Sequence, residues 1–155
     1  MSFRNVDVDA LDEEQLLQEE LFTFSDGNEI DSQTALKNVQ SKGTDVRNLS
    51  LRGDTLGALI AAIENPPYGL HTTEAKDKNT TIVMEVLIST KASDVPSLVE
   101  SLNAEQQDVL MKYIYRGMSS PKSYNSAVLL NWHEKLTEVA GLGSIVRVFT
   151  DRKTV

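Results

Sequence analysis

The side chains that most often carry catalysis or bind metals are scarce in this sequence. The chain has two histidines and no cysteine, which excludes a thiolate metal site, a disulfide and a cysteine nucleophile. His133 is followed by Glu134, but neighbouring residues of a helix point in different directions, and Thr137 stands where the zinc pattern needs a second histidine. We therefore interpret His133 as a half-buried, hydrogen-bonded structural residue. His71 lies in a predicted loop, with no partner nearby in sequence.

Two further patterns resemble a phosphate-binding loop and a pair of catalytic carboxylates, but a structural role explains each of them better. Gly141, Gly143 and Ser144 resemble part of a phosphate-binding loop, but the lysine, the third glycine and the preceding strand are missing. The pattern favours a helix end at Gly141 followed by an N-cap at Ser144. Paired glutamates at 13–14 and 19–20 lie in an acidic segment, where no packed scaffold could fix their distance or raise a pKa. The sequence therefore predicts no catalytic residue, no metal and no cofactor.

The net charge of −8 is concentrated at the N-terminus. The first 31 residues hold ten acids and one base, whereas the remainder holds thirteen acids and fourteen bases. An acidic segment repels phosphate, so nucleic acid and anionic membranes are not expected as partners. We interpret the small basic group of Arg147, Arg152 and Lys153 as charge near a helix C-terminus. No apolar run approaches the length that spans a bilayer, and the N-terminus does not resemble a secretory signal.

The acidic segment also carries large apolar residues, which solvated tails rarely do. Phe3, Val6 and Val8 alternate with charged residues, as in an extended segment that lies on a surface with its apolar side chains facing down. Two interpretations remain open for this segment: a solvated tail, or an arm that becomes ordered on a partner.

From residue 31 onward the pattern is typical of short helices. Breaks at Gly43, at Gly53, at the Pro66–Pro67 pair, at Pro121 and at Gly141 divide this part into about seven helices. Residues 81–90 are rich in β-branched side chains and could form a buried strand. We predict a central helix instead, because charged residues before them extend the pattern beyond strand length. Helices of this kind pack on their neighbours in a compact superhelix, so the predicted fold class is all-α.

Two helices offer candidates for the core and for an interface. Tyr113 and Tyr115 are two positions apart on one helix and cannot face the same core. We assign Tyr115, with the adjoining Arg116, as the candidate partner contact of the body. The next helix has a predicted buried stripe of Val128, Trp132, Leu136 and Val139.

Several strings of residues, in combination, point to a known family. They are LMKYIYRGM at 110–118, LLNWHEKL at 129–136 and GLGSIVRVFTDRKTV at 141–155, with FRNVDVD at 3–9, AAIENPP at 61–67 and VLISTKASDV at 86–95. Together they resemble the small fifth subunits (p16) of the actin-related protein 2/3 complex, the actin-filament nucleator. Residues 26–45 depart from the family pattern, with SQTALKNVQSK in place of a Gly-rich acidic spacer. The resemblance also favours a final helix at 144–150, where the residues alternate like a strand.

The resemblance implies a non-catalytic structural subunit of the cytoplasmic actin cytoskeleton, without a cofactor. Its fold would be a helical body, residues 31–155, preceded by an extended acidic arm, residues 1–30. The body would dock on the β-propeller and scaffold subunits, and the arm would tether one actin-related protein. The arm residues implied in binding are Phe3, Arg4, Val6, Asp7, Val8 and Asp9. Two alternatives stay open: a helical adaptor of another cytosolic assembly, and an enzyme without a recognised motif.

Overall fold

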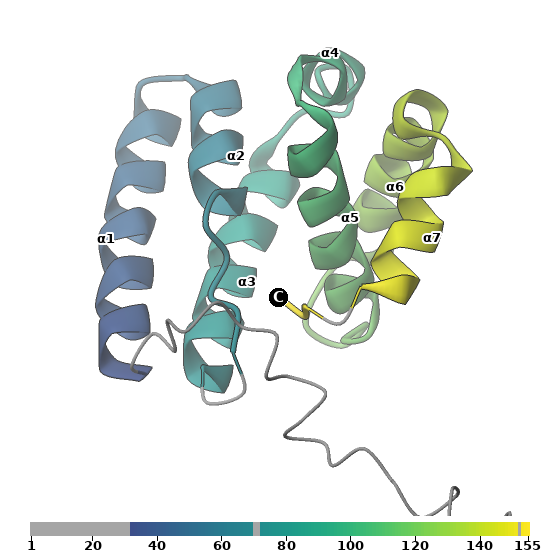
Figure 1. Ribbon diagram of the computed structural model, residues 1–155. Helices are drawn as coiled ribbons and strands as arrows, with labels where there is room; N and C mark the ends of the chain where they lie inside the picture. Colours follow the sequence, from purple (N-terminus) through teal and green to yellow (C-terminus); the bar gives the residue numbers. More distant parts are fainter. Residues whose placement is uncertain (1–31, 70–71, 152) are drawn as a thin grey trace, which may run out of the picture.

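The computed structural model describes residues 32–69, 72–151 and 153–155 of the chain. In these residues the structure has seven α-helices and no strand, which confirms the all-α prediction (Figure 1). The predicted arm at 1–30, with its six candidate binding residues, lies outside the described residues, as does His71.

The helices follow one another with short connections. Their bounds are α1 Ser32–Leu51, α2 Thr55–Ile63, α3 Thr73–Ser89, α4 Val95–Ser101, α5 Ala104–Met118, α6 Ser126–Ala140 and α7 Leu142–Thr150.

The helices form an array with α1 at one edge and α7 at the other, and α3 and α5 lie between them (Figure 1). Helix α1 packs on α2 and α3, whereas α7 packs on α5 and α6. One main hydrophobic core joins residues from α1 to α6 and also includes Val155, near the middle of the array. Since α3 contacts α1, α2, α5 and α6, the predicted central helix is confirmed.

The predicted break at Gly43 is wrong, because α1 runs without interruption from residue 32 to residue 51. Gly43 is buried in the middle of the helix, and a Cβ atom there would lie 3.0 Å from Cδ1 of Ile82 on α3. The glycine therefore allows α1 and α3 to approach closely and does not end a helix. The sequence pattern could not separate these two roles, since the residues beside Gly43 are polar and the contact that needs a glycine comes from the distant Ile82.

Side chains cap the starts of two other helices, and α2 ends where its predicted break lies. Asp54 caps α2 by accepting a hydrogen bond from the amide of Gly57 at 2.8 Å. Asn103 and Gln106 form a capping box at the start of α5, which satisfies two backbone donors that the helix leaves free. After α2, Asn65 takes a left-handed φ of 45° before the two prolines, so the helix ends as predicted.

The predicted α6 stripe is partly confirmed. Trp132 and Leu136 are fully buried, and Trp132 donates its indole N–H to the carbonyl of Leu87 at 3.2 Å. Val139 is 43% exposed, so its place in the stripe was wrong. Ser144 is likewise not an N-cap: it lies buried inside α7 and donates its hydroxyl to the carbonyl of Gly141 at 2.8 Å. Helix α7 itself is confirmed.

Candidate partner-binding site

Helix α5 directs its two central tyrosines to different places, as their spacing predicts. Tyr113 is fully buried, and its hydroxyl is hydrogen-bonded to the Asn79 amide of α3. Burial raises the pKa of the Tyr113 hydroxyl, although the hydrogen bond to Asn79 opposes the shift. Tyr113 therefore belongs to the core, which leaves Tyr115 as the interface candidate of the pair.

Tyr115 is half-buried and joins α5 to α6 and α7. Its hydroxyl is hydrogen-bonded to Nε2 of His133 at 3.0 Å, and the two rings meet edge to face with their centroids 5.5 Å apart. The ring of Phe149 lies 5.0 Å from that of Tyr115. His133 is thus a half-buried, hydrogen-bonded structural residue, as predicted. Any partner that covers Tyr115 will also contact α7, because Phe149 is largely exposed beside it.

Arg116 makes contacts within the chain. Its guanidinium pairs with the carboxylate of Asp77 at 2.7 Å and donates a hydrogen bond to the carbonyl of Val155. Lys112, one turn earlier, donates to the carboxylate of Asp151 at 2.5 Å and to the backbone carbonyl at 153 at 3.0 Å. Two cations on one face of α5 thus hold the segment after α7 against the body.

The same segment reaches α3. Lys76 donates to the hydroxyl of Thr154 at 3.0 Å, and Val155 is buried in the main core. Burial lowers the pKa of Lys76, and the nearby charge of Arg116 lowers it further. Sequence reasoning missed this arrangement, since the only available signal was the spacing of Lys112 and Arg116 on one helical face.

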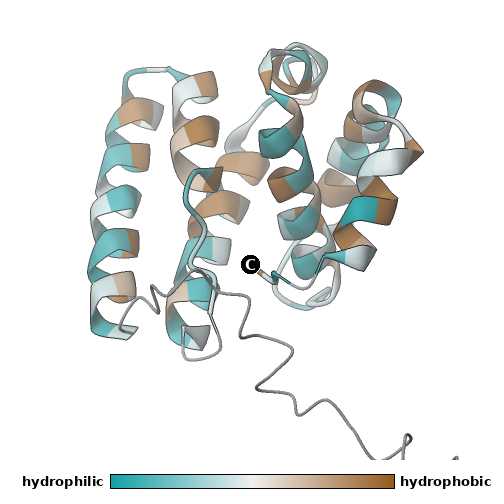
Figure 2. Ribbon diagram, viewed as in Figure 1, coloured by the Kyte–Doolittle hydropathy of each residue, from teal (hydrophilic) through white to brown (hydrophobic). Residues whose placement is uncertain are grey.

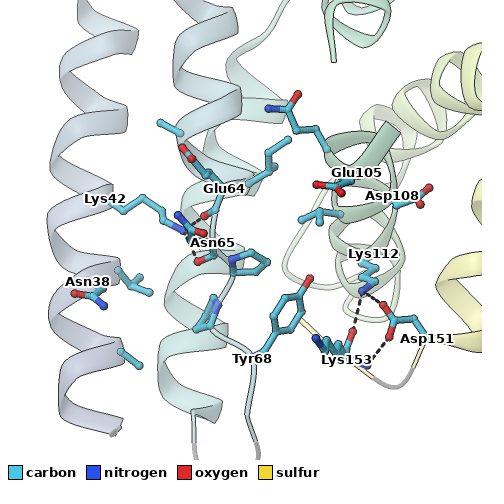
Figure 3. A pocket seen from close by; sticks show the side chains of 18 of the residues that line it. Asn38, Lys42, Glu64, Asn65, Tyr68, Glu105, Asp108, Lys112, Asp151 and Lys153 are labelled. Carbon is cyan, nitrogen blue, oxygen red and sulfur yellow. Dashed lines mark hydrogen bonds and ion pairs between the residues drawn. The ribbon is translucent and has the colours of Figure 1, made fainter. Parts of the chain in front are cut away.

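A groove of about 1350 Å3 runs between the α1–α2 edge and the α5–α7 side of the body (Figure 3). Tyr68 stands on its wall, and the ammonium group of Lys112 lies 5.2 Å from the centre of the tyrosine ring. On the α1 side of the groove Lys42 donates to the carbonyls of Glu64 and Asn65 at 2.5 and 3.2 Å. Lys42 therefore fastens α1 to the end of α2, where helix carbonyls lack partners.

Three of the cations that line the groove, Lys42, Lys112 and Arg147, are engaged by groups of the same chain. Burial lowers the pKa of Lys42 to about 8, although its ammonium group is held by two carbonyls. Arg147 of α7 binds Asp108 of α5 through two hydrogen bonds of 2.6 and 2.8 Å. Arg147 lies in the last turn of α7, as predicted for a charge near a helix C-terminus, and its fork of two donors also matches the facing carboxylate of Asp108.

Within the described ranges, no group of three or more histidine, cysteine or acidic side chains could hold a metal ion. Among the same residues, no helix combines the length and the apolar character needed to cross a membrane. The site is best described as a set of contacts: aromatic and apolar residues on the α5–α7 side, and in the groove polar residues, of which Lys42, Lys112 and Arg147 are paired within the chain.

A family comparison covers almost all of this structure. The model of the ARP2/3 complex 16 kDa subunit (p16-Arc) family matches residues 2–155, which include nearly all of the predicted arm, every helix of the described residues and the segment that Lys112 and Arg116 hold. The chain belongs to the p16-Arc family. The resemblance seen in its sequence strings is thereby confirmed.

Individual relatives of the p16-Arc family agree with this result. "Actin-related protein 2/3 complex subunit 5-C" of Xenopus laevis is 44% identical over 157 residues, covering 99% of this chain and 94% of the relative. The human "Actin-related protein 2/3 complex subunit 5-like protein" is 39% identical over 153 residues, with the same coverage. "Actin-related protein 2/3 complex subunit 5" of Dictyostelium discoideum is 43% identical over 103 residues, covering 66% of this chain and 73% of the relative.

Proposed function

We propose that this chain is a non-catalytic structural subunit of the actin-related protein 2/3 complex and supports actin-filament nucleation and branching in the cytoplasm. The observation that carries the proposal is the family match across residues 2–155. Two relatives that align along nearly their whole length are named as subunit 5-C and as a subunit 5-like protein of that complex. The partners are the other subunits of the complex, and no cofactor, nucleic acid or membrane takes part.

The body, residues 31–155, docks on the β-propeller and scaffold subunits. Internal pairing supports this role. Lys42, Lys112 and Arg147 each bind a group elsewhere in the same chain, and these contacts hold the segments of the body in a fixed arrangement for docking. Tyr115 is a docking residue at the α5–α7 side, where it is half-buried beside Phe149. Arg116 contributes mainly by holding the C-terminal segment, and a partner reaches it only at its exposed edge.

The arm, residues 1–30, tethers one actin-related protein. Its six predicted binding residues support this role, because apolar and charged residues alternate in the sequence, a pattern typical of an extended segment that lies on a surface. Phe3 and Arg4 carry the largest share of the binding, since a large aromatic residue and the only base of the arm lie side by side. Asp7 and Asp9 then fix the position of the arm along the surface of the actin-related protein.

Co-assembly tests the proposal as a whole. We mix the tagged full-length chain with the other subunits of the actin-related protein 2/3 complex and measure the native mass of what the tag recovers. A single assembly that contains one copy of the chain and all other subunits is expected. Recovery of the chain alone would refute the proposal, and a pull-down from extract that recovers a different assembly would favour an adaptor role elsewhere.

The tether is tested in the assembled complex. Phe3→Ala and Arg4→Ala should each weaken retention of the actin-related protein by about tenfold or more. Gln18→Ala, a substitution in the same arm outside the predicted binding residues, is the matched control and should leave retention unchanged. Equal retention in all three variants would contradict the assignment of the arm residues.

A further inference from the structure

The two edge helices of the array differ in what they present outward. Up to Ser50, every exposed residue of α1 is polar or charged, and only Leu51 at its last position is apolar. In Figure 2 the hydrophobic colouring of α1 lies mainly on the side turned to α2. A polar outer face of this kind is what a terminal helix needs where a helical array ends in water. The outer face of α1 therefore needs no further helix to cover it.

Helix α7, at the other edge, exposes large apolar side chains. Leu142, Val146 and Phe149 are 73%, 59% and 71% exposed, although the helix also packs Ile145 and Val148 inward against the core. The exposed three have the spacing of residues on a single helix face. We call Leu142, Val146 and Phe149 the α7 outer face.

The exposed three lie on a face of α7 adjacent to that of Ile145 and Val148, so the apolar surface of the helix is wider than a single neighbouring side would need. The described part of the chain covers only one side of α7, through α5 and α6. Hydrophobic colouring along α7 is visible at the edge of the array in Figure 2. Three large apolar side chains lie together on this face, whereas scattered single ones would need no explanation.

The α7 outer face offers no free charge to a partner. The only charged residue of α7 is Arg147, and both of its hydrogen bonds to Asp108 turn it towards α5. A partner that placed a charged side chain on this face would strip that charge of its water without providing an opposite charge to pair with it. The matching surface is therefore apolar and uncharged.

The area of the face argues against a second copy of the chain. The exposed fractions of Leu142, Val146 and Phe149 amount to about two fully exposed side chains, which is on the order of 400 Å2 at most, since even an aromatic side chain contributes only about 150–250 Å2. A stable dimer needs about 800 Å2 from each partner. The face therefore suits one contact within a larger assembly, where other contacts supply the remaining area.

We propose that the α7 outer face binds an amphipathic helix of another subunit, which packs along α7 and extends the array by one more helix. This inference rests on the proposed function, because it assigns a surface and a type of partner to the docking of the body. The occupant presents apolar residues at the three- and four-residue spacings of a helix, without charge in that stripe. Tyr115 lies at the end of the same contact, beside Phe149.

Charge insertion on α7 tests the inference. Val146→Asp and Leu142→Asp each place a carboxylate in the apolar contact, and each should weaken incorporation by about 30-fold or more. Thr44→Asp is the matched control, because it makes a similar change at an exposed position of the opposite edge helix. The probe is the actin-related protein 2/3 complex assembled without its fifth subunit, titrated with each full-length variant.

Two further measurements distinguish weakened incorporation from loss of folding and from self-association. The unfolding midpoints of Val146→Asp and Thr44→Asp should equal that of the wild type, which shows that lost incorporation is not lost folding. Sedimentation of the isolated chain should show a monomer, and a dimer abolished by Val146→Asp would overturn the inference in favour of self-association. If the wild type does not incorporate, the proposed function itself fails. If the wild type and both α7 variants incorporate equally, only the inference about α7 fails.

Discussion

Trp132→Ala should lower the free energy of unfolding of the body by about 3–5 kcal/mol. The indole is fully buried on α6, so its removal costs both the transfer free energy and the cavity that remains. Its N–H also donates to the carbonyl of Leu87, one of the last four carbonyls of α3 and therefore without a partner inside that helix. Trp132 thus fills the core and caps a neighbouring helix.

A second variant separates these two contributions. Trp132→Phe keeps most of the ring volume and loses the N–H, so we expect a loss of about 1–3 kcal/mol from the unpaired carbonyl and the imperfect fit. Unfolding in urea should be followed by far-UV circular dichroism, because Trp132 is the only tryptophan of the chain. A midpoint for Trp132→Ala equal to that of the wild type would refute the packing argument for α6.

Three further changes test single features of the fold. Gly43→Ala should change the free energy of unfolding by less than about 1 kcal/mol, because the gain in helix propensity offsets the contact with Ile82. A larger loss in chemical denaturation would mean that Ile82 cannot move. Asn103→Ala should cost about 1 kcal/mol through loss of the capping box, and an unchanged thermal midpoint would contradict that role. Burial raises the pKa of Tyr113 above 10.0, so above pH 10 the unfolded state releases its phenolic proton first and stability falls as pH rises. Tyr113→Phe should remove part of this fall in a series of unfolding curves, and an identical pH slope would count against it.

The helical fold could be predicted from sequence because its signals are local. The predicted breaks at Gly53, at Pro66–Pro67 and at Gly141 act within a few residues, and the structure uses them as expected. Gly43 was misread because its function depends on Ile82, which lies 39 positions further along the chain. Close approach between two helices leaves no local pattern that differs from a helix end.

In the candidate site, too, features set by nearby residues were predicted, and contacts between residues far apart in the sequence were not. The different directions of Tyr113 and Tyr115 follow from helix geometry and were predicted. The contacts of Lys112 and Arg116 with the segment after α7 join residues about 40 positions apart and were not. Exposure of Val139 also escaped prediction, because helical periodicity indicates a stripe but does not fix its width.

Deletion of residues 1–31 tests most directly the claim that the body holds the subunit in place while the arm tethers an actin-related protein. The deletion removes no described helix, since α1 begins at Ser32. The truncated chain should keep the far-UV spectrum of a helical protein and assemble with the other subunits. Its complex should retain the actin-related protein more weakly and nucleate branched filaments more slowly in a polymerisation assay. Nucleation by the truncated complex as fast as by the full-length one would contradict the tether.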